Sequence, residues 1–333
     1  MILHKSLFGN NKTMAMAEAH QDYIQEYLDF AIQLAKEAGA IIKAAVDSRM
    51  AGTGSSVEVK KNNPTDLVTE TDKAVEEFIK NRLNKTYPDH KFIGEETFAS
   101  GAKTEFTDLP TWIVDPIDGT TNFVHGYPFV AVSIGFTINK IPTIGVVYNP
   151  LLDELYSAAK GKGAYLNETK RLPLFHPAPP LIDLGHCLVS TEAGSDRSKA
   201  VIDAKISAIH NIVCKKSKEH PFGAEAHSIR TTGSAAINLC HIAKGITDVY
   251  WEVGCWEWDV AAAIVIVMES GGLVMEGDHD KTNIERPVNI FSRKYLAIRA
   301  AEDRQEQLKV AAQMKDLIPE IDAPRPPVPG GFE

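Results

Sequence analysis

The chain has 333 residues and a formal net charge of −9, with 44% apolar and 24% charged residues. These values are ordinary for a globular protein, and they exclude a disordered chain, a collagen-like chain and a nucleic-acid binder that works by bulk positive charge. No run reaches the roughly 18 apolar residues needed to cross a bilayer. The length suggests two domains, or one large layered one. The four cysteines have no C-x-x-C spacing and are too few to staple the chain, which favours a cytoplasmic protein.

The first hundred residues carry two helical patterns separated by a loop and a short strand pattern. The second helix starts at Thr71, next to Asp72, and Tyr87-Pro88 stops it. The predicted elements are a disordered or weakly targeting extension at 1–20, a helix at 23–47, a flexible loop at 51–56 and a strand at 57–60.

After Trp112 the pattern changes to short, β-branched runs with turn signals between them. The predicted strands are 113–114, 129–138, 143–148, 155–159 and 163–166. A segment with four prolines at 172–181 is the best candidate for an interdomain passage. Helical patterns follow at 200–212, 234–243 and 259–270, the last closed by Gly271-Gly272.

The stretch DPIDGTTNF, residues 115–123, places two carboxylates three positions apart just after a predicted strand. A proline fixes φ between Asp115 and Asp118, so both side chains can converge on one point beyond the strand. Carboxylates, with the Ile117 carbonyl, are oxygen ligands of the kind Mg²⁺ takes. Gly119 lets the backbone approach a ligand, and the following amides can bind phosphate at a helix N-terminus. Taken alone, the motif is better explained by an Asx turn with Asp118 as a helix cap.

Further acidic segments lie elsewhere in the chain. Glu95 and Glu96 follow an apolar pair, where adjacent acids are usually just solvated. Asp259 directly precedes the apolar helix, so it is either a helix cap or a third carboxylate aimed into the same site. Asp72 either caps the second helix or orients a hydroxyl that activates water, and the residues leave both open. All four tryptophans lie beside these acidic segments, which favours a shared, walled cleft.

Together, GEE (94–96), DPIDGTTNF (115–123) and WDVAA (258–262), with PTDLVTETD (64–72), resemble the motifs of the inositol monophosphatase family, in particular its eukaryotic members. The resemblance covers about residues 23–318. It implies a mixed α+β or α/β fold, an alternating αβαβα layered sandwich of the sugar-phosphatase type. It also implies Mg²⁺ dependence with two to three ions per active site, lithium inhibition and commonly a homodimer.

The resemblance also implies an organisation of the chain. One family domain spans residues 21–322, with sub-regions at about 21–171 and 182–322, and a Pro/Gly-rich disordered tail follows at 323–333. The segment CKKSKEHPFGAEAH at 214–227 and the proline-rich 172–181 region look longer than in compact family members. Both are expected to border the active-site mouth or the dimer face.

Carried over to this sequence, the family pattern assigns metal ligands. Glu95, Asp115 and the Ile117 carbonyl would hold the first Mg²⁺, and Asp115, Asp118 and Asp259 the second. A weaker third ion would lean on Glu95 through water.

The same pattern assigns catalytic and substrate-binding roles. The implied catalytic residues are Thr120, Asp72 and Glu95, with Thr120 and Asp72 positioning and deprotonating the attacking water. The amides of Gly119 and Thr120 would receive the phosphate. The implied substrate contacts are Ile117, Asp118, Gly119, Thr120, Gly233, Ser234, Ala235, Glu252 and Asp259, with Ser195 nearby.

Elementary physics supports this set. Carboxylates around a phosphate ester repel it unless metals reverse the local field. A bound metal lowers the pKa of its water towards ~7 and screens the leaving alkoxide, so direct hydrolysis needs no phosphoenzyme. The expected function is hydrolysis of myo-inositol monophosphates to inositol and phosphate, as in inositol biosynthesis and phosphatidylinositol signalling.

Two alternatives stay open. One is a related phosphomonoesterase acting on 3′-phosphoadenosine phosphate, fructose 1,6-bisphosphate or histidinol phosphate. The other is a non-catalytic inositol- or metal-binding regulator. The expected partner is a small-molecule phosphate ester, with neither nucleic acid nor membrane.

Overall fold

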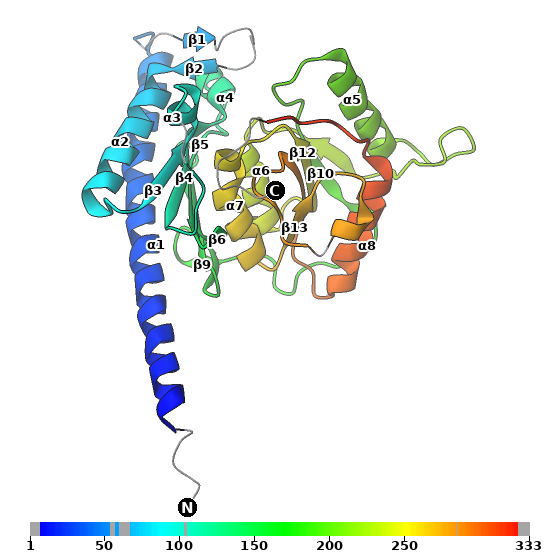
Figure 1. The fold of residues 1–333 in the computed structure, drawn as a ribbon. Helices are drawn as coiled ribbons and strands as arrows, with labels where there is room; N and C mark the ends of the chain where they lie inside the picture. The colour runs from blue at the N-terminus through cyan, green and yellow to red at the C-terminus, as the bar shows by residue number, and fades with distance from the viewer. Residues whose placement is uncertain (1–6, 54–56, 60–66, 103–104, 285, 326–333) are drawn as a thin grey trace, which may run out of the picture.

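In a computed structural model, the chain folds into five alternating layers of helices and sheets (Figure 1). The structure describes residues 7–53, 57–59, 67–102, 105–284 and 286–325. From one side to the other, the layers are a helix pair, a seven-stranded sheet, a second helix pair, a five-stranded sheet and a third helix pair. This is the αβαβα sandwich that the sequence predicts, and the prediction is confirmed.

The large sheet has the strand order β3-β4-β5-β6-β7-β8-β9 and is antiparallel except for the β3–β4 pair. Its strands carry the residues at 113–166 that the sequence assigns to β structure. The bounds are β3 Lys91–Gly94, β4 Thr111–Asp118, β5 Ala131–Ile138, β6 Ile141–Asn149, β7 Glu154–Ala159, β8 Gly163–Leu166 and β9 Lys170–Arg171.

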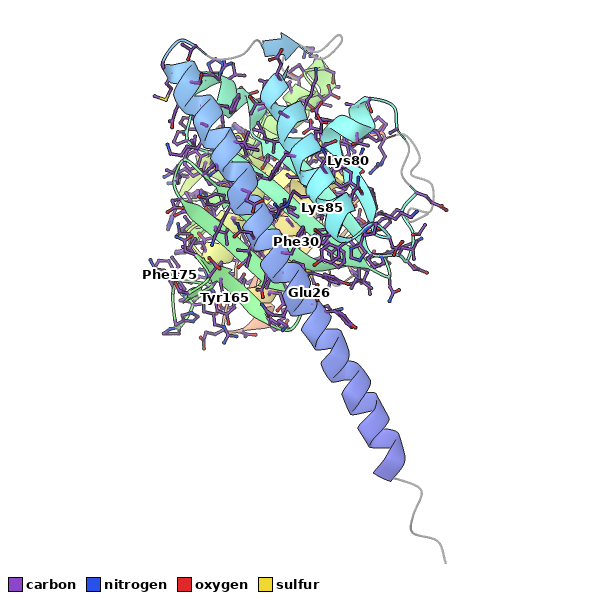
Figure 2. The ribbon with its side chains drawn as sticks, turned by 90° about the vertical axis from the view of Figure 1, so that its left-hand side faces the viewer. Glu26, Phe30, Lys80, Lys85, Tyr165 and Phe175 are labelled. Atoms are coloured by element: carbon purple, nitrogen blue, oxygen red, sulfur yellow. The ribbon has the colours of Figure 1, made fainter. Side chains whose placement is uncertain are left out.

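The first helix pair, α1 (Leu7–Met50) and α2 (Glu70–Thr86), covers the outer face of this sheet (Figure 2). Its apolar stripe, including Leu34 and Ile79, packs on Trp112 of β4 in one continuous core. The helix α1 begins at Leu7, well before the predicted start at residue 23, and Figure 1 shows it continuing past the rest of the molecule. The physical reason is the run TMAMAEA, whose alanine, methionine and glutamate residues favour helix.

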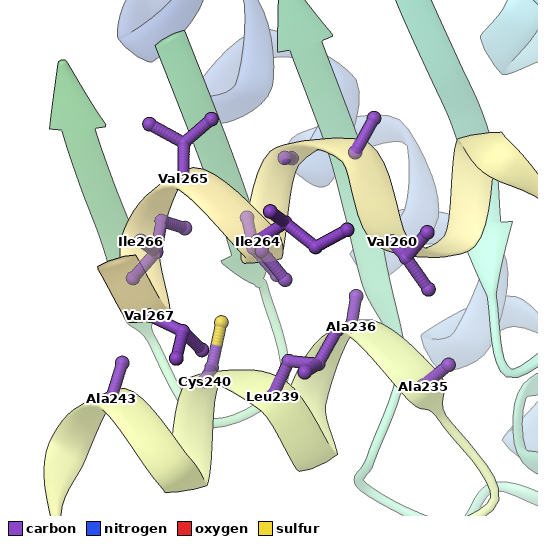
Figure 3. Packing of buried hydrophobic residues seen from close by; sticks show 14 of the residues in the cluster. Ala235, Ala236, Leu239, Cys240, Ala243, Val260, Ile264, Val265, Ile266 and Val267 are labelled. Atoms are coloured by element: carbon purple, nitrogen blue, oxygen red, sulfur yellow. The ribbon is translucent and has the colours of Figure 1, made fainter. Parts of the chain in front are cut away.

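The central layer consists of α6 (Ala235–Lys244) and α7 (Glu257–Glu269), which lie face to face between the two sheets (Figure 3). Alanines on α6 let the helices approach closely, and Val260 and Ile264 of α7 are fully buried. A Cβ on Gly145 of β6 would lie 1.9 Å from the Ala262 carbonyl oxygen, so only glycine allows α7 to sit this close to the sheet. This packing fixes the start of α7, where Asp259 lies.

The small sheet has the order β11-β10-β12-β14-β13, and its outer face is covered by α5 and α8. None of its strands was predicted, because they are only three to five residues long and separated by longer segments. The bounds are β10 Leu188–Thr191, β11 Ser228–Arg230, β12 Val249–Val253, β13 Leu273–Glu276, β14 Lys294–Ile298, α5 Lys199–Val213 and α8 Arg304–Leu317.

The remaining elements are short. The proline-rich segment at 172–181 connects β9 of the large sheet to the elements that precede β10 of the small sheet. No helix in the described residues is long and apolar enough to span a bilayer. The short elements are β1 Val57–Val59, β2 Leu67–Thr69, α3 Glu95–Ala99, α4 Thr120–His125 and the 3₁₀ helices Leu184–His186 and Lys281–Asn283.

Candidate active site

Two carboxylates lie at the end of β4. The strand runs through Asp118 itself, so both acids belong to the strand rather than to a loop beyond it. The pairing with β5 shifts register between Asp115 and Asp118, and the Ile117 amide donates to Asp115 Oδ1 at 2.9 Å. Such an irregularity re-aims side chains at a sheet edge. Gly119 then turns the chain into α4 with φ +91°, a conformation that favours glycine.

Asp118 connects the two sub-regions of the chain. Its Oδ2 accepts hydrogen bonds from the Ser234 hydroxyl at 2.5 Å and the Ala236 amide at 2.7 Å. These donors stand at the start of α6, where Ser234 is the N-cap. Burial raises the pKa of Asp118 to about 7 despite these donors. The alternative explanation of the isolated motif, in which Asp118 caps the helix that follows it, does not hold, because its donors come from a helix more than a hundred residues away.

Asp259 reaches the same point from α7. It is the third residue of that helix rather than its cap, and its Oδ2 accepts from the Trp256 amide at 2.7 Å. Its carboxyl also accepts a hydrogen bond from that of Asp115. Burial, together with neighbouring carboxylates including Glu95, raises the pKa values of both well above the ordinary range. Two charged carboxylates in such contact require a proton or a cation between them.

Asp72 takes part in the cap of α2 and also contacts the Thr120 hydroxyl. Its Oδ2 accepts from the Thr69 amide and hydroxyl, a capping-box arrangement at the start of α2. Its Oδ1 accepts from the Thr120 hydroxyl at 3.0 Å. That hydroxyl also lies 3.1 Å from the Ile117 carbonyl, so one hydrogen is shared between two acceptors. Burial raises the pKa of Asp72 to about 6, and nearby Glu95 adds to the effect.

These groups open onto a cavity of about 440 Å³. Most of the predicted site residues line it, while Asp72 lies behind Thr120 and reaches the cavity through that hydroxyl. Glu252, on β12, is buried and accepts from the Tyr250 hydroxyl, and burial raises its pKa to about 7. The predicted residues in the lining are Glu95, Asp115, Ile117, Asp118, Gly119, Thr120, Ser195, Gly233, Ser234, Ala235, Glu252 and Asp259.

The sequence did not indicate Glu192, which shapes the far wall of the cavity. Its Oε1 accepts from the amides of Thr232 and Gly233, at 2.6 and 2.8 Å, and from the Asn238 side chain at 2.8 Å. These bonds hold the turn that leads into Ser234. Glu192 follows β10 without any local motif, so its role depends on long-range packing that no sequence pattern reports.

The tryptophans divide between cavity and core. Trp256 and Trp258 line the cavity with stacked rings, 5.2 Å apart and 11° from parallel. Trp112 is buried under the first helix pair, and Trp251 under the outer helices. The prediction that all four share one cleft is therefore correct for two of them.

Arginines on Trp256 anchor the C-terminal segment beside the cavity. Arg293 stacks on the indole at 3.9 Å and donates to the Pro324 carbonyl at 2.6 Å. Arg325 donates to both carboxylate oxygens of Glu257, at 2.8 and 3.2 Å. The sequence predicted a disordered tail from residue 323, and the structure places 323–325 against α7 because Glu257 supplies a buried partner. Residues 326–333 lie outside the described part of the chain.

We expect Arg325→Ala to lower the free energy of unfolding by about 3–5 kcal/mol, since a buried carboxylate would lose its partner. The Glu257 and Arg325 side chains are only 2% and 13% exposed, so water replaces the pair poorly. Denaturant unfolding of Arg325→Ala and of the double variant with Glu257→Gln measures the effect. The double variant should recover most of the loss, and a single variant within ~0.5 kcal/mol of the parent would contradict the prediction.

The acid cluster fits a hard divalent cation. Among the residues that the structure describes, no lysine or arginine forms an ion pair with Asp115, Asp118 or Asp259. With Glu95 and the Ile117 carbonyl alongside, every donor is an oxygen, as Mg²⁺ prefers. Burial, and after it the neighbouring like charges, raise the pKa values of these acids, and a bound cation would offset both effects.

Comparison with known proteins agrees with this geometry. A model of the inositol monophosphatase family matches residues 24–317. The chain belongs to the inositol monophosphatase family. Inositol monophosphatase 3 of Solanum lycopersicum is 46% identical over 259 residues, which cover 78% of this chain and 88% of that protein. Protein qutG of Emericella nidulans is 38% identical over 323 residues, covering 92% and 97%.

The fold is shared with solved members of the inositol monophosphatase family. The crystal structure of extragenic suppressor protein suhB from Bartonella henselae matches with a TM-score of 0.67 at 29% identity, covering 87% of this chain and 98% of that one. Enzymes of the inositol monophosphatase family are phosphoric monoester hydrolases, and this chain belongs to that class.

Proposed function

We propose that the protein is a Mg²⁺-dependent phosphatase that hydrolyses myo-inositol monophosphates to inositol and phosphate. The observation that carries the proposal is that Glu95, Asp115, Asp118 and Asp259 line one cavity together with Glu252. The first group suits a cation and a phosphate, and the second suits hydroxyl groups of a polyol. One cavity therefore offers a place for each half of the substrate.

The proposed ligands are the four acids with the Ile117 carbonyl, and the number of ions, two to three, belongs to the proposal. The chemistry that divalent cations supply here is neutralisation of the phosphoryl charge and a lowered pKa of bound water. Gly119 and Thr120 line the same cavity as these acids, and we assign their amides to the phosphate oxygens.

Proton handling falls to Asp72 and Thr120. When the Thr120 hydroxyl donates to Asp72 Oδ1, its own oxygen lone pairs face the cavity and can accept a hydrogen from water. The Asp72 carboxylate then takes a proton through that hydroxyl. A pKa of about 6 suits a base that is mostly ionised at neutral pH.

We expect Glu252→Gln to change substrate selection rather than the chemical step. Loss of a charged hydrogen-bond acceptor costs about 1.5–3 kcal/mol, or about 10–100-fold in kcat/KM for the inositol ester. Phenyl phosphate has no ring hydroxyls, so its hydrolysis should be nearly unchanged. Measuring kcat/KM for both esters shows whether the loss is confined to the inositol ester. Glu105→Gln, at an exposed glutamate, is the matched control. Equal losses on both substrates would contradict the assignment.

A substrate panel tests the proposed function. Phosphate release is measured with Mg²⁺ from myo-inositol 1-phosphate, 3′-phosphoadenosine phosphate, fructose 1,6-bisphosphate and histidinol phosphate, with and without Li⁺. Preference for the inositol ester, inhibited by Li⁺, is the expected result. Turnover of another ester alone would overturn the substrate while leaving phosphatase chemistry in place.

The proposal also includes a cytoplasmic location and a homodimer. A non-catalytic regulator is the second candidate, favoured by the similarity to Protein qutG, whose name states no activity. The acids and the Thr120–Asp72 pair are all in place, whereas a protein freed from catalysis can lose any of them. Absence of turnover on every ester, with Mg²⁺ binding retained, would favour the regulator.

A further inference from the structure

Three side chains that bind transition metals meet at the end of α5, outside the described lining of the catalytic cavity. They are His210, Cys214 and His220, and their ligand atoms all lie within 4.8 Å of one another. We propose that these three residues form a Zn²⁺ site that fastens the loop after α5 to the helix. The loop belongs to the 214–227 segment that the expected function does not use.

Helix α5 and the residue that caps its C-terminus supply two of the ligands in a fixed relation. His210 is in the last turn of α5, and the amide of Cys214 donates to its carbonyl at 2.8 Å. Residues four apart lie on one face of a helix. The His210 imidazole and the Cys214 thiol are therefore neighbours independently of the conformation of the loop that follows.

The loop brings the third ligand back to that face. His220 lies in a turn closed by two bonds to Ser217, one between the backbones at 3.1 Å and one from the His220 amide to the hydroxyl at 3.1 Å. Its ring centre is 5.0 Å from that of His210. The returning chain is tied to the helix end, since the amide of Glu225 donates to the Cys214 carbonyl at 3.2 Å.

Gly223 makes this close return possible. A Cβ there would lie 2.5 Å from the Cys214 carbonyl oxygen, a separation that side chains do not reach. A glycine at this point lets the loop lie directly on the helix end. The loop is thus held in the shape that presents His220 to the other two ligands.

The donor set selects the metal. Two imidazoles and one thiolate suit Zn²⁺, which takes Cys and His at 2.0–2.3 Å, and they do not suit Mg²⁺. Ligand atoms around one tetrahedral zinc are about 3.5 Å apart, so the side chains need to close by about 1 Å, which exposed rotamers can do. The fourth position is left for water.

The Cys214 thiol contributes a negative charge that attracts the zinc ion only when it is ionised. On binding, the Cys214 thiol gives its proton to solvent and a sulfur–zinc bond forms, with no change of oxidation state. Lys215, Lys216 and Lys218 are nearby but exposed, so water and salt screen their repulsion of the cation. The thiolate is therefore the decisive ligand.

Cobalt titration of the full chain tests this site. The protein is stripped with a chelator and supplied with excess Mg²⁺ for the carboxylates, then titrated with Co²⁺ while thiolate-to-cobalt absorption is recorded. The parent should show a band that saturates at one ion per chain and disappears when Zn²⁺ is added. Cys187 and Cys240 are buried, and Cys255 lies in the cavity whose carboxylates are supplied with Mg²⁺, so a band that is lost in Cys214→Ser belongs to Cys214.

Variants decide the outcome, and activity is not the readout. Cys214→Ser should abolish the band, and His220→Ala should weaken Co²⁺ binding by at least ~100-fold. Lys218→Ala, an exposed residue of the same loop, should match the parent. A parent without the band, or a Cys214→Ser variant that keeps it, would overturn the proposal whether or not the protein hydrolyses phosphate esters.

Discussion

Asp118→Asn is expected to lower kcat/KM for phosphate-ester hydrolysis by about 10²–10³-fold while the fold is retained. The substitution removes one negative charge from the proposed cation site and leaves the volume unchanged. An asparagine Oδ1 can still accept from Ser234 or Ala236, so the contact between β4 and α6 survives in part. Burial already raises the pKa of this carboxyl to about 7, so a neutral side chain costs little stability.

Two measurements separate the site from the fold. Mg²⁺ dependence of the residual rate should shift to higher concentrations in Asp118→Asn, while thermal unfolding without Mg²⁺ stays near the parent value. Asp108→Asn makes the same chemical change at an exposed aspartate and should match the parent in both. Parental activity with unchanged Mg²⁺ dependence in Asp118→Asn would show that Asp118 is not a ligand.

Helices and strands with a clear hydrophobic period in the sequence were predicted close to their observed bounds. The helix at 200–212 matches α5, that at 234–243 matches α6 within one residue, and the strands around 129–166 match β5 to β8. The helix predicted from residue 259 begins at Glu257, and Asp259 accepts from the Trp256 amide, one residue before that start. Propensity and periodicity suffice for such segments, because their neighbours in space are also neighbours in sequence.

Features made by distant contacts could not be read in this way. The strands of the small sheet are too short to show a period, and the two arginines that seat the C-terminal segment find their partners only in the folded chain. Glu192 is the clearest case, since the amides that donate to its carboxylate lie about forty residues further on. The acid cluster was found because the family motifs mark it, and its roles as ligands and base stay predictions.

Asp72→Asn is expected to reduce kcat/KM by about 10²–10⁴-fold, the usual contribution of a general base. Only the carboxylate can take a proton from the Thr120 hydroxyl, and an amide cannot. The parent should therefore be active above a pH of about 6 and lose activity as the pH falls through the pKa of Asp72. A bound cation lowers that pKa, so the acid limb with Mg²⁺ lies at or below this value.

The pH profile distinguishes loss of the base from loss of structure. In Asp72→Asn the residual rate should lack this acid limb, because the group that titrates there has been removed. An asparagine Oδ1 can still accept from the Thr69 amide and keep the cap of α2, so thermal unfolding should change little. Glu70→Gln, an exposed acid in the same helical turn, serves as the control and should keep the parental profile. If Asp72→Asn keeps the parental rate and limb, the proton passes to another group, and the Thr120–Asp72 contact serves only to join α2 to the start of α4.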